Sequence, residues 1–102
     1  MDKVGFIGLG AMGGPMAWNI RSGGYPLGVY NRSPARTEPF REESVAVFAT
    51  PREAAARSDV VIVMVTDSHA LKAVVEGPDG IAEGAAPGKV VINMSTVSPE
   101  AA

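Results

Sequence analysis

The stretch Gly8-Leu9-Gly10-Ala11-Met12-Gly13 decides the fold of this 102-residue chain. Residues 3–7 precede it and form a short apolar run that is typical of a buried β-strand. Residues 12–21 include apolar side chains that recur at helical spacing. The predicted core face of that helix consists of Met12, Met16, Ala17 and Ile20. The sequence therefore predicts a strand, a glycine turn and a helix in direct succession.

The spacing of the three glycines, G-x-G-x-x-G, predicts a role for this turn. The first glycine permits a tight turn, the second lets the backbone approach a pyrophosphate, and the third lets the helix pack closely on the strand. Free N–H groups at the start of the helix favour a bound phosphate. We therefore expect a dinucleotide cofactor here, and a purely structural turn is the alternative. The predicted cofactor-binding residues of this segment are Gly8, Leu9, Gly10, Ala11, Met12 and Gly13.

The rest of the chain alternates strands with helices. Further strands are predicted at residues 27–30, 46–49, 60–65 and 90–94, and further helices from residue 35, from residue 51 and over residues 68–76, with a glycine-rich connection up to residue 88. Thr50 and Glu53 have the spacing of a capping box, which marks the start of the second of these helices. Apolar strands alternating with helices predict an α/β fold, a doubly wound parallel sheet in the strand order 3-2-1-4-5 with helices on both faces.

Composition limits the classes of function. Hydrophobic residues make up 46% and charged residues 20% of the chain, as in an ordinary globular domain. Nine basic and eleven acidic residues give a net charge of −2 and are scattered, so neither nucleic-acid nor membrane binding is expected. The absence of cysteine excludes disulfides and thiolate chemistry, and it fits a cytoplasmic location. No metal site is expected, and the single histidine, His69, is interpreted as a surface or capping residue.

Residues 31–33 follow the second predicted strand and bear on the choice of dinucleotide. Enzymes that use NAD usually carry a carboxylate there, which binds the 2′-hydroxyl of the ribose. This chain has Asn31, Arg32 and Ser33 instead, so a guanidinium and a hydroxyl are available for a 2′-phosphate. We expect these three residues to contact the cofactor and NADP to be preferred. If Arg32 is only a solvated loop residue, NAD is an equal alternative.

Four segments together resemble the β-hydroxyacid dehydrogenases, a family that includes 3-hydroxyisobutyrate dehydrogenase, tartronate semialdehyde and glyoxylate reductases and 6-phosphogluconate dehydrogenase. The segments are Phe6-Ile7-Gly8-Leu9-Gly10-Ala11-Met12-Gly13-Gly14-Pro15-Met16, Val29-Tyr30-Asn31-Arg32-Ser33, Val63-Met64-Val65-Thr66-Asp67 and Asn93-Met94-Ser95-Thr96-Val97-Ser98-Pro99. The resemblance implies a Rossmann fold in which the backbone of Val65 and Thr66 passes close to the cofactor. It also implies that Thr96 contacts the nicotinamide end and Ser95 the carboxylate of the substrate. Asn93 replaces the aspartate that is more common in the family.

By the same resemblance, residues 1–102 are the incomplete N-terminal part of a two-domain, NADP-dependent oxidoreductase. That enzyme would transfer hydride between nicotinamide and a small β-hydroxy acid or semialdehyde, and the full-length protein would be a homo-oligomer. The catalytic lysine of the family lies in a helical C-terminal domain, and no lysine of this chain occupies such a segment, so no catalytic residue is assigned here. Ser98-Pro99-Glu100 predicts a helix start just before Ala102, which indicates a longer polypeptide.

Two alternatives stay open beside this interpretation. An NADPH-dependent imine reductase has nearly the same opening signature, although Ser95, Thr96 and Pro99 favour the hydroxyacid branch. A non-catalytic nucleotide-binding or interaction module needs no catalytic lysine. A residue outside this chain would separate the two enzymes.

Overall fold

The structure is a computed structural model that describes residues 2–10, 12–65, 68–84 and 88–94. The elements are β1 (Val4–Ile7), α1 (Gly13–Ser22), β2 (Leu27–Tyr30), the 3₁₀ helix η1 (Pro34–Thr37), α2 (Glu38–Glu42), β3 (Ala46–Val47), α3 (Pro51–Arg57), β4 (Val60–Val63), α4 (Ser68–Glu76), α5 (Ile81–Gly84) and β5 (Val90–Asn93). A membrane-crossing helix is absent from these ranges, where the longest helix, α1, has 10 residues.

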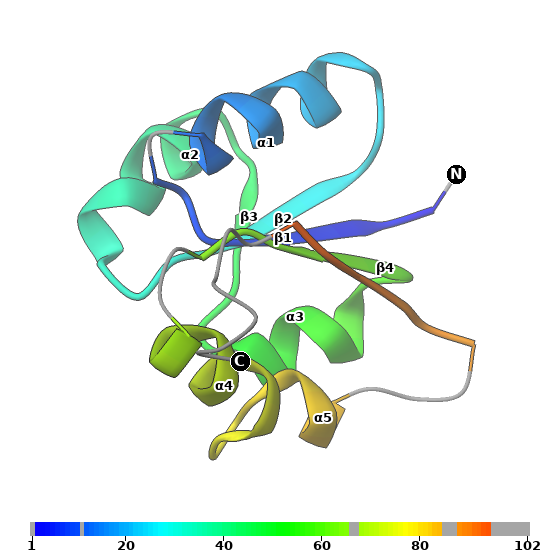
Figure 1. The fold of residues 1–102 in the computed structure, drawn as a ribbon. Helices are drawn as coiled ribbons and strands as arrows, with labels where there is room; N and C mark the ends of the chain where they lie inside the picture. Colours follow the sequence, from blue (N-terminus) through cyan, green and yellow to red (C-terminus); the bar gives the residue numbers. More distant parts are fainter. Residues whose placement is uncertain (1, 11, 66–67, 85–87, 95–102) are drawn as a thin grey trace.

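The five strands form one parallel sheet in the order β3-β2-β1-β4-β5, which confirms the predicted order 3-2-1-4-5. Helices α1 and α2 lie on one face of the sheet, and α3, α4 and α5 lie on the other (Figure 1). In the register, Phe6 of β1 aligns with Val29 of β2 and with Ile62 of β4. The doubly wound, Rossmann-like fold predicted from the sequence is therefore confirmed.

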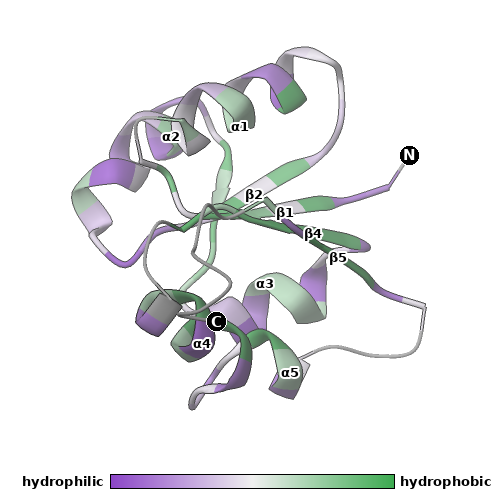
Figure 2. Cartoon of the chain, viewed as in Figure 1, coloured by the Kyte–Doolittle hydropathy of each residue, from purple (hydrophilic) through white to green (hydrophobic). Residues whose placement is uncertain are grey.

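Each face of the sheet has its own hydrophobic core, and β1 supplies both. On the face of α1 and α2 the buried cluster is Phe6, Leu9, Ala17, Val29, Phe40 and Val45. On the other face it is Ile7, Ala54, Ala55, Val61, Val63 and Ile81. Successive strand side chains point to opposite faces, so a strand covered on both sides must be apolar at every position. Figure 2 shows the strands as the hydrophobic centre between helices whose polar residues face outward.

Local signals in the sequence explain several boundaries. The Oγ1 atom of Thr50 accepts a hydrogen bond from the Glu53 N–H at 3.1 Å, as in a capping box. The Glu53 carboxylate turns back to the N–H of Ala49, one residue before the cap, at 2.8 Å. At the end of α1, Gly24 has φ +92°, a conformation that glycine adopts without strain.

Helix α5 was not predicted, because the glycines around it were interpreted as a connection. Ile81 is 2% exposed and belongs to the core of that face. Gly84 lies so close to the backbone of Arg52 in α3 that a Cβ atom there would overlap its carbonyl oxygen. Tertiary packing on α3 therefore holds a helical turn in a stretch whose composition predicts a loop.

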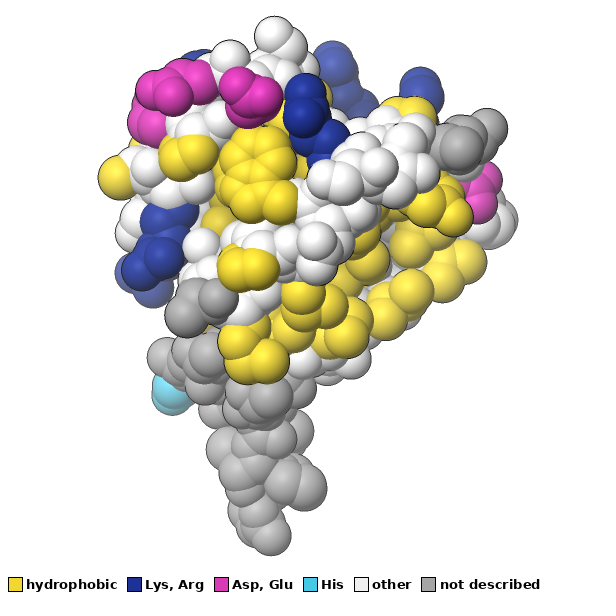
Figure 3. Space-filling model, turned by 90° about the horizontal axis from the view of Figure 1, so that it is seen from above, with side chains coloured by type: hydrophobic (Ala, Val, Ile, Leu, Met, Phe, Trp, Pro, Cys, Tyr) yellow, Lys and Arg dark blue, Asp and Glu magenta, His cyan; other side chains and the backbone are white. Residues whose placement is uncertain are grey.

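Strand β5 is less covered than the other strands of the sheet, although its predicted segment is as apolar as theirs. Its residues are exposed, and hydrophobic side chains gather in a band along this edge of the molecule in Figure 3. The exposed apolar residues of this edge are Val90 (50%), Val91 (44%), Ile92 (42%) and Met94 (42%). On the face of α1 and α2, the two helices pack over β1, β2 and β3, at the opposite side of the sheet. An apolar strand is thus left partly open at the edge.

Candidate cofactor site

The glycine turn lies at the carboxyl end of β1, between two neighbouring strands. The N–H of Gly8 donates to the carbonyl oxygen of Tyr30 in β2 at 3.0 Å. On the other side, the N–H of Met64, directly after β4, donates to the carbonyl oxygen of Ile7 at 2.8 Å. After β1 the chain forms β2 and β3 on one side of this strand and then returns to form β4 and β5 on its other side. The glycine turn therefore lies at the point where the strand order reverses. In open α/β sheets, ligands bind at that point, outside the carboxyl ends of the strands.

Gly8 and Gly13 are required by the fold itself. Gly8 has φ +99°, and a Cβ atom there would overlap the carbonyl oxygen of Met64. A Cβ atom on Gly13 would overlap the carbonyl oxygen of Gly8. The first glycine therefore brings the turn against β4, and the third brings the start of α1 against the turn, which agrees with the predicted roles.

Gly10 differs from these two glycines. A Cβ atom built on it meets nothing within 4 Å, and its φ is not positive. Neither steric crowding nor backbone conformation within the described residues requires glycine at this position. The predicted role of the second glycine is to let the backbone approach a pyrophosphate closely. That role needs open space over Gly10, and the structure leaves this space open.

The start of α1 next to Gly10 offers unpartnered hydrogen-bond donors. Among the described residues, no hydrogen bond uses the N–H of Gly10, Met12 or Gly13, and Met12 provides no side-chain cap. No acidic side chain lies in the first turn of α1. Helix N-termini attract anions through such N–H groups and through the helix dipole. The turn therefore presents donors that suit the oxygens of a phosphate group.

Two predicted contact residues of the turn behave differently from expectation. The N–H of Leu9 donates to Oδ1 of Asn31 at 2.8 Å, so this donor is already used within the protein. Met12 was predicted to belong to the core face of α1 but is 64% exposed, whereas Met16 and Ile20 pack against the core. The reason is that α1 begins at Gly13, so Met12 precedes the helix and does not follow its periodicity.

Asn31 connects the glycine turn to the loop after β2. While its Oδ1 accepts from Leu9, its Nδ2 donates to the carbonyl oxygen of Ser33 at 3.0 Å. Both ends of the amide are thus used to position backbone, which makes Asn31 a positioning residue of the site. The side chains of Arg32 and Ser33 are exposed beside this link.

Arg36 belongs to the same neighbourhood and was missed by the sequence prediction. Its Nη1 atom donates to the carbonyl oxygen of Leu9 at 3.5 Å, which places a second guanidinium beside the glycine turn. The signal in the sequence was an arginine four residues after Arg32, about one helical turn away. Only the position of η1 shows that it reaches back to this turn.

A cavity of about 480 Å³ opens beside the turn, a volume typical of small-molecule sites. Gly8, Asn31 and Arg32 line one side of it. Val65, after β4, and His69 of α4 line another, and His69 is exposed, as expected of a surface residue. Val65 thus lines the same cavity as Gly8, Asn31 and Arg32, the predicted cofactor-binding residues that follow β1 and β2. The predicted site residues Ala11, Thr66, Ser95 and Thr96 lie outside the described residues.

Within the described residues, no three His, Asp or Glu side chains come together as a metal site. The donors that the site presents are backbone N–H groups and guanidinium groups, which suit phosphate oxygens. The parallel sheet, the glycine turn at its switch point and these donors define the chain as a dinucleotide-binding domain.

The chain belongs to the family of the NAD-binding domain of 6-phosphogluconate dehydrogenase, whose family model matches residues 3–102. This confirms the resemblance found in the sequence at the level of the family. Three similar proteins show how broad the family is. An uncharacterized oxidoreductase of Bacillus subtilis, YfjR, is 44% identical over 96% of this chain. Mouse mitochondrial 3-hydroxyisobutyrate dehydrogenase is 40% identical over 94% of the chain, and the cytokine-like nuclear factor N-PAC of Xenopus tropicalis is 38% identical over 96%.

Solved structures agree with this assignment. An imine reductase from Myxococcus stipitatus in complex with NADP+ matches 98% of the chain with a TM-score of 0.85 and 28% identity. A 3-hydroxyisobutyrate dehydrogenase from Mycobacterium tuberculosis matches 100% of it with a TM-score of 0.84 and 32% identity. The chain covers 34% of each of these two structures, and 34%, 29% and 18% of YfjR, the mouse enzyme and N-PAC. It therefore spans about a third or less of the length of its relatives.

Proposed function

We propose that this chain is the cofactor-binding domain of an NADP-dependent oxidoreductase of the β-hydroxyacid dehydrogenase family. The observation that carries the proposal is the open space over Gly10, beside the N–H groups of Met12 and Gly13, which have no partner among the described residues. Packing explains why residues 8 and 13 are glycines. At Gly10 the proposed reason for glycine is a bound pyrophosphate, which would occupy the space that a side chain would otherwise fill. When bound, the cofactor supplies the hydride chemistry, and the protein binds and orients it.

The preference for NADP rests on charge at the end of β2. No carboxylate occupies residues 31–33. Arg32 lines the cavity beside the glycine turn, and the guanidinium of Arg36 donates to the carbonyl oxygen of Leu9. A 2′-phosphate carries up to two negative charges and accepts bidentate hydrogen bonds from arginine. The ribose hydroxyl of NAD offers neither, so these arginines favour NADP.

The proposed reaction is hydride transfer between nicotinamide and a small β-hydroxy acid or its semialdehyde. The mouse and mycobacterial 3-hydroxyisobutyrate dehydrogenases support this branch. The resemblance of residues 93–99 to the substrate motif supports it too, with Ser95 as the proposed ligand of the substrate carboxylate and Thr96 at the nicotinamide. The catalytic lysine is proposed to lie in a further domain of a longer protein.

Imine reduction is the second candidate, and the NADP+ complex of the Myxococcus stipitatus enzyme favours it. The complete gene product separates the two candidates. With NADP and 3-hydroxyisobutyrate, a hydroxyacid dehydrogenase forms NADPH, which is measured by its absorbance. With NADPH and a cyclic imine such as 1-pyrroline, an imine reductase consumes it. Turnover of the imine without turnover of any β-hydroxy acid would reject the proposed reaction and leave the cofactor assignment standing.

Cofactor binding is tested on the chain itself by calorimetry with NADPH and NADH. In the variant Gly10→Ala the methyl group occupies the open space, so NADPH affinity falls at least about tenfold while the fold is unaffected. Gly14→Ala is the matched control, because its Cβ meets only the carbonyl oxygen of Leu9 at an ordinary 3.6 Å. The control is expected to bind like the wild type.

Three results would contradict the proposal. If the folded wild-type chain binds neither dinucleotide, the proposed cofactor site is rejected. Equal NADPH affinity in Gly10→Ala and wild type removes the role of the open space. NADH affinity equal to or above that of NADPH removes the role of the arginines.

A further inference from the structure

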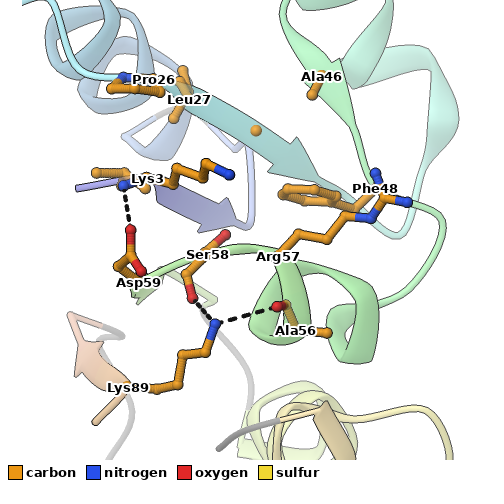
Figure 4. A pocket seen from close by; sticks show the side chains of 12 residues that line it. Lys3, Pro26, Leu27, Ala46, Phe48, Ala56, Arg57, Ser58, Asp59 and Lys89 are labelled. Carbon is orange, nitrogen blue, oxygen red and sulfur yellow. Dashed lines mark hydrogen bonds between the residues drawn. The ribbon is translucent and has the colours of Figure 1, made fainter. Parts of the chain in front are cut away.

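A second cavity lies at the amino edge of the sheet, opposite the glycine turn. Its volume is about 470 Å³, similar to that of the cofactor-side cavity. It opens between the first residues of β1 and β2, the strand β3, the end of α3 and the residue before β5 (Figure 4). The proposed cofactor function uses none of the residues that line it.

The lining of this amino-edge cavity is rich in positive charge. Lys3, Arg57 and Lys89 contribute three cations, and among the described residues that line it Asp59 alone contributes a carboxylate. The whole chain, by contrast, carries a net charge of −2. Three of its nine basic side chains therefore meet around one cavity, where field lines concentrate and anions are attracted.

Two of the four charges are already engaged. The ammonium of Lys89 donates to the carbonyl oxygens of Ala56 and Ser58 at 3.2 and 2.6 Å, which neutralises the negative end of α3. A carboxylate oxygen of Asp59 accepts from the backbone N–H of Lys3 at 2.8 Å. Figure 4 shows both interactions at the rim.

The side chains of Lys3 and Arg57 are not engaged in this way. Among the described residues neither side chain has an ion pair or a hydrogen bond. Both line the cavity, Lys3 from the residue before β1 and Arg57 from the end of α3 (Figure 4). Two uncompensated cations thus face one concave surface.

The inner wall of the cavity is apolar. The ring of Phe48 lies over Gly28 of β2, where a Cβ atom would overlap it, and Leu27 and Pro26 continue this wall. An apolar wall below two free cations suits a molecule with an apolar body and an anionic head.

At the base of the cavity lies a hydroxyl that the fold leaves without a partner. Ser58 is 1% exposed, and its Oγ is the buried side-chain polar atom without a hydrogen bond in the described part of the chain. In Figure 4 this hydroxyl lies against β1, where it covers Gly5. A buried polar group without a partner is costly, so this hydroxyl is a local weak point of the packing beneath the cavity.

We propose that the amino-edge cavity binds a small organic anion, with its carboxylate or phosphate group between Lys3 and Arg57 and its apolar part against Phe48. The guanidinium of Arg57 donates to the anionic group, and the ammonium of Lys3 adds charge from β1. Side-chain rotamers at such exposed rims adjust readily on binding. The site is separate from the cofactor cavity and does not depend on the proposed function.

The test is a titration of the ¹⁵N-labelled chain followed by two-dimensional NMR, with three probes that share a phenyl ring and differ in the head group. Phenylacetate carries a carboxylate, phenyl phosphate a phosphate and phenylacetamide no charge. At least one anion is expected to give saturable shifts in Lys3, Phe48 and Arg57 with a dissociation constant of about 1 mM or below. The tighter of the two anions identifies the head group of the natural ligand, and phenylacetamide binds at least about fivefold more weakly.

Two variants locate the contact. Arg57→Gln is expected to weaken binding of the anion about fivefold or more, because it removes the charged donors. Arg41→Gln is the matched control, since Arg41 is an exposed arginine of α2 outside the cavity. Lys3→Gln is the second variant should Arg57→Gln not fold, because the backbone contacts of Lys3 survive the change.

Four results would overturn the proposal. The first is the absence of saturable shifts up to about 20 mM of either anion, and the second is an affinity for phenylacetamide equal to that for the anions. The third is that Arg57→Gln and Arg41→Gln weaken anion binding equally. The fourth is that the shifts map to Gly8–Gly13 instead of the cavity. The last result would mean that the anion binds at the glycine turn.

Discussion

Glycines lie at both edges of the sheet, but they are used differently. At the amino edge, Gly5 and Gly28 are covered by side chains of the same protein, the Ser58 hydroxyl and the Phe48 ring. At the carboxyl edge, Gly8 and Gly13 are covered by backbone, whereas none of the described residues covers Gly10. A glycine that its own fold covers is explained by packing. A glycine with open space above it and no positive φ, as at Gly10, is the one that needs an external partner.

The same contrast holds for polar groups. The carboxyl edge presents backbone N–H groups on a helix start that have no partner in the described part of the chain, and a pyrophosphate is their proposed partner. The amino edge presents unpaired side-chain cations and a buried hydroxyl, Ser58, around a cavity with an apolar wall. One edge is built to bring backbone close to a ligand, and the other presents side chains to one. Substitutions at single positions test this difference.

The largest effect is expected for Gly8→Ala. The methyl group would overlap the Met64 carbonyl oxygen, and the backbone at φ +99° disfavours any side chain. We expect the free energy of unfolding to fall by at least about 3 kcal/mol, measured by urea denaturation followed by circular dichroism. Gly10→Ala, the same change in the same turn, should alter it by less than about 0.5 kcal/mol. Similar losses in both variants would show that Gly10 too is explained by packing.

A smaller effect is expected for Asn31→Ala, which removes the link between the glycine turn and the loop after β2. Two hydrogen bonds are lost, and the part-buried N–H of Leu9 is left without its acceptor. The expected loss of stability is about 2 kcal/mol, with weaker NADPH binding in calorimetry.

Asn31→Asp is the companion variant for this link. It keeps the acceptor for Leu9 but loses the donor to Ser33, so its cost in stability should be about half that of Asn31→Ala. Its carboxylate should also weaken NADPH more than NADH, because it repels a 2′-phosphate. An Asn31→Ala variant with wild-type stability would show that this amide does not position the turn.

The smallest effect is expected at the amino edge and has the opposite sign. Ser58→Ala removes a buried hydroxyl without a partner, so the free energy of unfolding should rise by about 1 kcal/mol. Thr37→Val is the matched contrast, because the buried hydroxyl of Thr37 donates to the Pro34 carbonyl oxygen at 2.6 Å. That variant should lose about 1 kcal/mol. A loss of stability in Ser58→Ala would mean that this hydroxyl is satisfied in the free protein.

The sequence predicted the parts of the site that depend on local patterns. The glycine spacing, the strand before it and the helix after it are contiguous, and so the turn at Gly8–Gly13 was placed correctly. Arg36 and the double role of Asn31 were missed. The partner of Asn31 lies 22 residues away and that of Arg36 lies 27 residues away, so no local spacing reveals either contact.

Strands β1, β2 and β4, their parallel arrangement and the family were determined by the sequence itself. A strand buried on both faces must be apolar at every position, and a turn that approaches a phosphate must lack side chains. Other features were decided only by the tertiary structure. It shows that Gly10 is the glycine of the turn that packing does not require, that Met12 is exposed, and that Ile81 packs α5 into the core. It also shows that Lys3 and Arg57, cations 54 residues apart, line one cavity. These features arise from contacts between segments distant in the chain. Their geometry exists only once the sheet has brought the strand ends together.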